Sequence, residues 1–92
     1  MTIAIHHNEA QQRFETTVDG QLCVADYRLR GDVMWMTHTG VPPAVGGRGI
    51  AAELVRVALA YAEGHGLKVE PSCSYVEVYM RRHPETQALL AR

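Results

Sequence analysis

One cysteine near the end of the chain is placed where a thiol could do chemistry. Cys73 follows a short strand-like segment and stands where the next helix should begin. A thiol at a helix N-terminus has a lowered pKa and is more often the reactive thiolate. A nucleophilic cysteine also needs a base nearby, and His38 and His83 are the histidines that the fold could bring close. The alternative is that Cys73 is a small buried apolar side chain, as free cysteines often are.

A cluster of glycines in the middle of the chain could bind a phosphate group. Gly46, Gly47 and Gly49 surround Arg48, directly before a segment of helical periodicity that starts at Ile50. Glycines let the backbone approach a ligand closely, and the first N–H groups of a helix lack partners and carry partial positive charge. This arrangement suits a phosphate or pyrophosphate, with Arg48 as an added positive charge. An ordinary loop that caps the helix is the competing interpretation.

Two well-known phosphate-binding patterns fit this cluster less well. A P-loop is excluded because no Gly-Lys-Ser/Thr sequence occurs. Residues 47–52 match the dinucleotide fingerprint G-x-G-x-x-A, and Glu70 lies about 20 residues further on, where an acid would bind the ribose. That fingerprint should follow its strand tightly and open the fold, whereas here Pro42 and Pro43 intervene and strand-like segments come first. A nucleotide-binding fragment that prefers NAD is therefore a minor alternative.

The segments before the glycine cluster predict an antiparallel meander. Apolar and polar residues alternate over 3–5 and 14–18, and Asp19-Gly20 is a strong hairpin signal. The next strand covers 22–30, and one of its faces is expected to carry Cys23, Ala25, Tyr27 and Leu29. Residues 33–39 are large on both sides, which predicts a central strand covered on both faces.

After the glycine cluster the apolar pattern becomes helical. A helix should start at Ile50 and end at Gly64 or Gly66. A short strand is expected over 68–70, ended by Pro71. Residues 72–82 are ambiguous, although three of them have helical spacing, namely Val76, Tyr79 and Met80. Pro84 fits the first turn of a last helix over 85–90, so the chain reads as a single α+β domain with a mixed sheet.

Composition and charge exclude several classes of protein. The 92 residues suffice for one domain and are far fewer than the roughly 250 of a TIM barrel. Nine basic and ten acidic residues give a net charge of −1, which argues against a dedicated nucleic-acid binder. No apolar run approaches the roughly 20 residues of a membrane-spanning helix, and no signal peptide is recognisable. His6, His7 and His65 show no metal-ligand spacing with one another or with the two cysteines, so we expect no structural zinc. We expect free thiols, a cytoplasmic location, no membrane or nucleic-acid partner, and a monomer or weak homodimer.

Four short segments in combination resemble one protein family. They are His38-Thr39-x-Val41-Pro42, Gly47-x-Gly49-Ile50-Ala51, Pro71-x-Cys73-Ser74-Tyr75-Val76 and Arg82-His83-Pro84-Glu85. The glycine segment resembles motif A of the GNAT acetyltransferase superfamily, and the combination resembles its small, single-domain, YjdJ-type N-acetyltransferases. Gly46 stands where that motif usually has Arg or Gln, which removes a side chain and leaves the backbone N–H groups.

The resemblance implies a compact GNAT-like fold and acetyl-CoA as cosubstrate. It implies a pyrophosphate site made mostly by the backbone of Gly46, Gly47, Arg48, Gly49, Ile50 and Ala51. Main-chain groups near Val41 would polarise the thioester carbonyl, and Tyr75 or Tyr79 would protonate the departing CoA thiolate. In this setting His38 is a candidate base, and Cys73 lies beside the acyl group or accepts it.

The implied function is transfer of an acetyl group from acetyl-CoA to an unidentified amine, with protein and peptide amines as candidates. The alternative is an acyl-CoA-binding or interaction module with little or no catalysis. The chain is shorter than usual GNAT domains, shows no N-terminal helices, and has no clear carboxylate pair or general base. Both hypotheses include CoA binding, so turnover with amines is what separates them.

Overall fold

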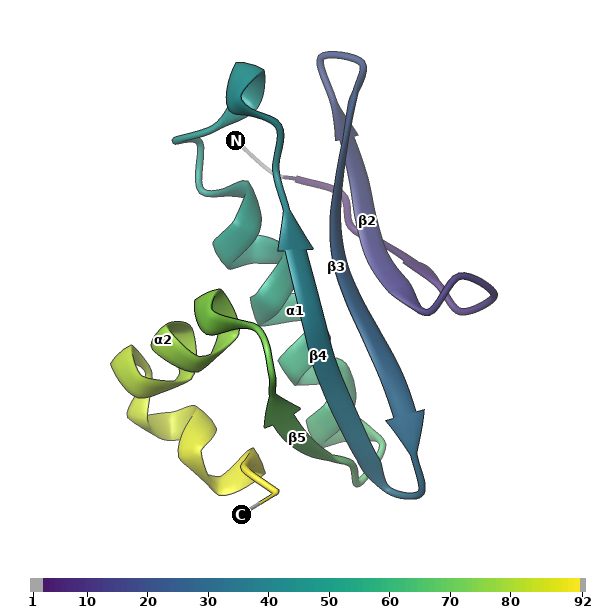
Figure 1. Cartoon of the computed structure of the whole chain (residues 1–92), viewed down its shortest axis with the longest axis vertical. Helices are drawn as coiled ribbons and strands as arrows, with labels where there is room; N and C mark the ends of the chain where they lie inside the picture. Colours follow the sequence, from purple (N-terminus) through teal and green to yellow (C-terminus); the bar gives the residue numbers. More distant parts are fainter. Residues whose placement is uncertain (1–2, 92) are drawn as a thin grey trace.

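The chain forms a five-stranded sheet with two helices packed against it. The computed structural model describes residues 3–91 (Figure 1). The strands lie in the order β1-β2-β3-β4-β5, and all neighbours are antiparallel except β4 and β5. In chain order the elements are β1 (His6–Asn8), β2 (Arg13–Val18), β3 (Gln21–Arg30), β4 (Val33–Gly40), the 3-10 helix η1 (Pro43–Val45), α1 (Ile50–Gly64), β5 (Lys68–Pro71), α2 (Ser74–Arg82) and the 3-10 helix η2 (Pro84–Leu89). The predicted α+β class with a mixed sheet is confirmed.

Tight turns set the register of the N-terminal meander. Asp19 and Gly20 both have positive φ, 50° and 75°, as a two-residue hairpin turn between β2 and β3 requires. A second turn after Asn8 fixes the pairing of β1 at its three residues. The prediction of a strand over 3–5 is therefore wrong, because this segment precedes the paired residues. Ile3 and Ile5 instead pack, partly buried, against the core.

The core lies between the sheet and the apolar side of α1. The buried side chains of this helix recur every three or four residues, as the periodicity predicts, and they are Ile50, Leu54, Val55, Ala58, Leu59 and Ala62. On the sheet side, Ala25, Tyr27, Met34 and Met36 are at most 2% exposed. Their burial on alternate positions of β3 and β4 follows the two-residue period of a strand.

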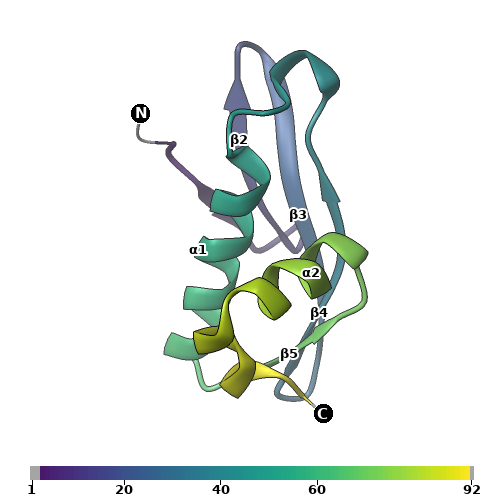
Figure 2. The ribbon, with the colours of Figure 1, turned by 90° about the vertical axis from the view of Figure 1, so that its left-hand side faces the viewer.

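The second face of the sheet has no helix on it in the described part of the chain. Figure 1 and Figure 2 together show α1 and α2 on the same side of the sheet. The prediction that the central strand is covered on both faces is therefore wrong. Val33 and Trp35 are only half-buried on the open face, and the guanidinium of Arg30 lies 5.1 Å from the Trp35 ring. Leu29 was expected on the same face as Cys23, Ala25 and Tyr27. It is 45% exposed, whereas those three are buried, and β2 pairs with β3 no further than Asp26.

The second half of the chain adds a parallel strand and closes the core. β5 pairs with β4 from Val33 to Met36, and α2 then buries Val76 and Met80, which resolves the ambiguous segment as a helix. The last helix, expected over 85–90 with Pro84 in its first turn, is the 3-10 helix η2. The side chains of Thr86 and Gln87 both bond to the carbonyl oxygen of Met80, which holds this segment against the end of α2.

A histidine on β1 joins the meander to the end of α1 through an aromatic cluster. The Nε2 atom of His7 lies 2.5 Å from the Tyr27 hydroxyl, and the His7 ring stacks on Phe14 with centroids 4.1 Å apart. The ring of Tyr61 on α1 lies at a steep angle to the same ring, with centroids 4.4 Å apart. Burial lowers the pKa of His7, against a smaller raising effect from Glu9. The folded protein therefore favours the neutral imidazole.

We expect the free energy of unfolding to fall as the pH is lowered through about 6.5, the ordinary pKa of histidine. Below that value the unfolded chain binds a proton at His7 that the folded chain resists, so stability rises with pH across this window. Urea titrations between pH 5 and 7.5 would measure the effect. The variant His7→Gln should show a flatter profile, and an unchanged slope would mean that another group causes the dependence.

Candidate functional site

The glycine segment forms a loop whose backbone N–H groups have no partners. Gly47 and Gly49 both have φ of 76°, with Arg48 between them outside the positive-φ region. Alternation of this kind points successive N–H groups toward one concavity, which is an anion-binding arrangement. Within residues 3–91, no hydrogen bond is formed by the N–H groups of Gly47, Arg48, Gly49, Ile50 and Ala51. The N–H group of Gly46 differs, because it donates to the carbonyl oxygen of Pro43 at 3.1 Å.

The loop is held against the core by apolar side chains and leads directly into α1. Val45 is 1% exposed on one side of the glycines, and Ile50 is 2% exposed on the other. Gly49 caps the helix without a side-chain hydrogen bond, so the helix N-terminus keeps its unpaired N–H groups and its partial positive charge. The rigid anchoring of both ends presents these N–H groups in a fixed geometry suited to a phosphate group.

The Arg48 side chain already has an ionic partner. Its guanidinium donates to the carboxylate of Asp19 in the β2–β3 turn at 2.8 Å. Both side chains are exposed, at 41% and 66%, so this pair contributes at most about 1 kcal/mol. Arg48 can therefore exchange Asp19 for an anionic ligand at small cost.

The end of β4 leaves the sheet beside the start of α2. β4 pairs with β5 only as far as Met36, and the N–H group of Cys73 donates to the Met36 carbonyl oxygen at 2.9 Å. The pairing of β3 with β4 is irregular at one point. Tyr27 pairs with Met36 and the preceding Asp26 pairs with His38, so Thr37 has no pairing partner on β3. The edge of β4 from Thr37 to Gly40 is thus free of β5. Val41, half-buried, follows directly after this edge.

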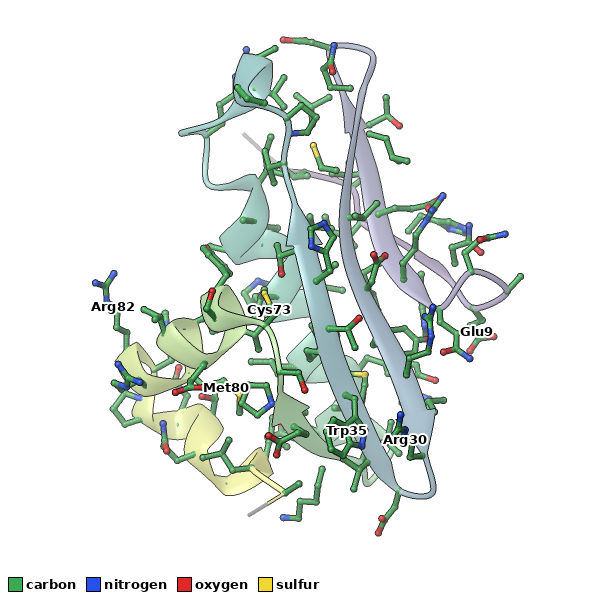
Figure 3. The ribbon with its side chains drawn as sticks, in the orientation of Figure 1. Glu9, Arg30, Trp35, Cys73, Met80 and Arg82 are labelled. Carbon is green, nitrogen blue, oxygen red and sulfur yellow. The ribbon has the colours of Figure 1, made fainter. Side chains whose placement is uncertain are left out.

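Cys73 lies at this edge, at the N-cap position of α2 (Figure 3). Its Sγ atom lies 3.7 Å from Oγ1 of Thr39 on β4. Burial acts to raise the pKa of the thiol, but hydrogen bonds from the backbone of Val76 and from the Thr39 hydroxyl outweigh it. The backbone of Tyr75 and Thr39 adds to the same effect, so the pKa of Cys73 is lowered. Several hydrogen-bond donors around the Cys73 sulfur therefore stabilise its thiolate form.

Among residues 3–91, no hydrogen bond joins His38 to Cys73. The His38 ring lies beside Gly40 and Val24. A Cβ atom built on Gly40 would come within 2.9 Å of the Nε2 atom of His38 and within 3.7 Å of the Val24 side chain. His38 pairs across the strands with Asp26, and its side chain is exposed. Thr39, one residue along β4, bonds to Cys73. His38 and Cys73 therefore lie at the same end of β4 without a hydrogen bond between them.

The two candidate tyrosines lie on one groove between the helices. Tyr75 is 40% exposed in the first turn of α2, whereas Tyr79 lies one turn further on and is half-buried. Burial raises the pKa of Tyr79, so the phenol keeps its proton at neutral pH. The His83 ring stacks on Tyr79 with centroids 3.9 Å apart, and its Nδ1 lies 2.7 Å from the Tyr79 carbonyl oxygen. His83 is thus bound to the end of α2, and no hydrogen bond joins it to Cys73 in the part of the chain that the structure describes.

Thr39 is the residue that the sequence did not single out for its side chain. It is separated from Cys73 by 34 positions, and only the pairing of β4 with the chain after β5 brings them together. Local sequence holds no signal for such a contact. The described residues contain no group of three or more His, Cys, Asp or Glu side chains that could hold a metal ion. No helix among residues 3–91 has the length and apolar character to cross a membrane.

Comparison with known proteins shows the family. Residues 13–89 match the model of a family described as GCN5-related N-acetyl-transferase, so the chain belongs to the GCN5-related N-acetyltransferases. Curated relatives are Protein NATD1 from Mus musculus and from Homo sapiens. Each is 31% identical over 90 residues, which is 95% of this chain and 82% or 80% of the relative. The family and its class of reaction, acetyl transfer to an amine, agree with the resemblance seen in the sequence.

A solved structure shows the same fold. The NMR structure of a GCN5-like protein from Staphylococcus aureus superimposes with a TM-score of 0.77 at 23% identity. The match covers 96% of this chain and 87% of that one. The predicted GNAT-like fold is confirmed by this match. Members of the family generally use acetyl-CoA as cosubstrate. The unpaired N–H groups from Gly47 to Ala51 are of the kind that bind phosphate.

Proposed function

We propose that this protein transfers the acetyl group of acetyl-CoA to an amine on a protein or peptide. The observation that carries the proposal is the run of unpartnered backbone N–H groups from Gly47 to Ala51, at the start of a helix. Such groups bind phosphate without a side chain, which removes the objection raised by the missing Arg or Gln at position 46. Both cysteines are free thiols, which suits the reducing cytoplasm as the place where the protein would work. It would act as a monomer or weak homodimer.

The reacting end of the site would be the free edge of β4. Acetyl-CoA supplies an acetyl group activated as a thioester. Backbone N–H groups near Thr39 and Val41, with those at the start of α2, would stabilise the negative charge that develops on the carbonyl oxygen. One such donor contributes about 3–4 kcal/mol to an acyl transfer. Tyr75 or Tyr79 would give a proton to the thiolate that leaves.

The amine would approach from the open face of the sheet. An amine must lose its proton before it attacks, and His38 is exposed on this face at the end of β4. No helix covers the face among the described residues, so a residue on a large partner could reach the site. This openness favours a protein or peptide acceptor over a small amine that needs an enclosed pocket.

We expect the purified protein to acetylate peptide amines at a rate that falls about 100-fold in His38→Gln, the loss typical of a general base. Mass spectrometry of a panel of lysine and N-terminal peptides would measure turnover. Incubation with acetyl-CoA alone shows whether Cys73 gains an acetyl group, and Cys73→Ser separates an acyl-enzyme from direct transfer. A large loss in Cys73→Ser together with acetylated Cys73 supports the acyl-enzyme.

The second candidate function is a CoA-binding module without catalysis. The observation that favours it is the absence, among residues 3–91, of any histidine or carboxylate hydrogen-bonded to Cys73. Binding of acetyl-CoA without turnover of any amine, and without acetylation of Cys73, would support this function over the first.

A further inference from the structure

The open face of the sheet has an aromatic ring and basic side chains at one end. Trp35 on β4 pairs with Arg28 on β3 and with Glu70 on β5, so the three side chains share this face. The guanidinium of Arg30, two residues further along β3, lies 5.1 Å from the centre of the Trp35 ring (Figure 3). Trp35 is half-buried, whereas both arginines are exposed. We call these four residues the Trp35 patch.

The Trp35 patch has an excess of positive charge. Its two guanidinium groups face the single carboxylate of Glu70, so one positive charge remains in excess whichever groups pair. At the same end of the sheet Lys68 and Asp32 offset each other, and the ammonium group of Lys68 already donates to the carbonyl oxygen of Ala88 at 2.8 Å. A guanidinium binds a carboxylate through two parallel hydrogen bonds, and the neighbouring aromatic ring offers apolar contact. The patch therefore fits an acidic side chain.

The other end of the same face is negative and holds the candidate base. Asp26 pairs with His38 across β3 and β4, two residues before Arg28. On the adjacent strand β2, Arg13 and Glu15 form an ion pair with each other at 2.5 Å and so add no net charge. The face is thus polarised along β3, with a carboxylate beside His38 and an excess of positive charge at the patch. A peptide that brings an amine to His38 and a carboxylate to the patch matches both ends.

The distance between the two ends sets the spacing of the groups on such a peptide. Asp26 and Arg28 are two residues apart on one strand, which corresponds to about 7 Å. An extended peptide on this face covers the same distance in two residues, and it turns every second side chain toward the sheet. The acidic side chain should therefore lie two positions from the residue that bears the amine.

We propose that the Trp35 patch selects acceptor peptides with an acidic side chain two positions from the residue that bears the amine. The carboxylate binds the guanidinium of Arg30, and the methylene groups of the same side chain contact the Trp35 ring. The proposal rests on the proposed function, because it takes His38 as the place where the amine reacts. Nucleic acid is a poorer match, since bases bind to a sheet on two or three aromatic rings, whereas the patch offers one ring and one excess charge.

Trp35 is the only tryptophan of the chain, so its fluorescence reports directly on occupancy of the patch. Titration with three lysine peptides of equal length tests the proposal. The first has glutamate two positions from the lysine on both sides, the second has glutamine there, and the third has its glutamates directly beside the lysine. We expect the first peptide to shift the emission and to bind about three- to fivefold more tightly than the other two at low ionic strength. High salt should reduce this preference.

Two arginine variants locate the charge that causes the preference. Arg30→Gln should bind the three peptides equally. Arg81→Gln is the matched control, because it removes the same charge from α2, where Arg81 pairs with Glu77 at 3.1 Å on the helix side of the sheet. This variant should keep the preference. Mass spectrometry of the same peptides after incubation with acetyl-CoA should give acetylation rates in the same order.

The outcomes separate this inference from the proposed function. Equal affinity for the three peptides, a preference that survives in Arg30→Gln, or one that is lost in Arg81→Gln overturns the inference, and acetylation of all three peptides would leave the proposed function standing. Binding with the expected preference but without acetylation supports the patch and contradicts the proposed function. If only a single-stranded oligonucleotide or a higher protein concentration shifts the emission, the occupant is nucleic acid or a second copy, and the inference is overturned.

Discussion

Replacing Gly49 with valine should weaken acetyl-CoA binding by at least about 100-fold. The N–H groups around Gly49 are unpaired, and hydrogen bonds to a charged group each contribute about 1.5–3 kcal/mol. The space into which a side chain at this position would project is open, with no atom within 4 Å of an added Cβ. A valine there would occupy the place of the pyrophosphate and block the backbone approach. Calorimetric titration of the two proteins with acetyl-CoA measures the difference.

A matched control separates this effect from lost stability. Gly31, in the turn between β3 and β4, also has positive φ, and nothing lies within 4 Å of its added Cβ. Valine at either position costs about 1–3 kcal/mol in backbone strain. Gly31→Val should therefore be destabilised to a similar extent in urea titrations and yet bind acetyl-CoA as the wild type does. The milder Gly49→Ala provides a variant with less strain.

Two results would contradict this account of the glycine loop. Equal affinity of Gly49→Val and wild type would mean that no ligand approaches the backbone there. Equal losses in Gly49→Val and Gly31→Val would mean that stability, and not the loop, controls binding.

Much of the fold could be predicted because its signals are local. The Asp19-Gly20 turn and the period of the strand that follows it are contained in short stretches of sequence, and so is the apolar pattern of α1. Each agrees with the structure within a few residues. Local agreement of this kind is what allows a small domain to be read from one sequence.

The errors arise where neighbours in space decide the structure. Val33 and Trp35 are large apolar residues of the kind found on a strand that is buried on both faces. Both α-helices, however, lie on the face of the sheet opposite to these side chains, and the Arg30 guanidinium lies over the Trp35 ring. Leu29 has the correct position in the strand period, but the neighbouring strand is too short to cover it. The way the last helix is held was also not predictable, since the side chains of Thr86 and Gln87 bond back to α2, a contact that no periodicity records.

The candidate site divides in the same way. The glycine loop is local and was found from its composition and its place before a helix. The environment of Cys73 is not local, because Thr39 reaches it across the sheet and the irregular pairing of β3 with β4 decides which residues face it. The pairing of Arg48 with Asp19 likewise joins residues 29 positions apart. The sequence alone predicts that Cys73 lies at the start of a helix. The Thr39 hydroxyl that bonds to its sulfur is brought there by the fold and could not be predicted.

The second large effect concerns the reactivity of the two thiols. We expect iodoacetamide to alkylate Cys73 at least about 100-fold faster than Cys23 in the folded protein, since a core thiol reacts only when the structure opens. Cys23 is fully buried, and burial raises its pKa. Cys73 is half-buried, and its hydrogen bonds lower its pKa. Peptide mass spectrometry over a time course measures both rates, and in urea the two should become similar.

The pH profile of this reaction tests the donors around Cys73. Only the thiolate reacts, so a lowered pKa moves the midpoint of the rate profile below the ordinary value of 9.0. Thr39→Val removes the hydroxyl that stabilises the thiolate, which should raise the midpoint and slow alkylation at neutral pH about three- to tenfold. Thr37→Val is the control, because that hydroxyl bonds to the Asp26 carbonyl oxygen and not to sulfur. If both variants keep the wild-type midpoint, the Thr39 hydroxyl does not stabilise charge at this position. The lowered pKa of Cys73 would then depend on its backbone donors alone.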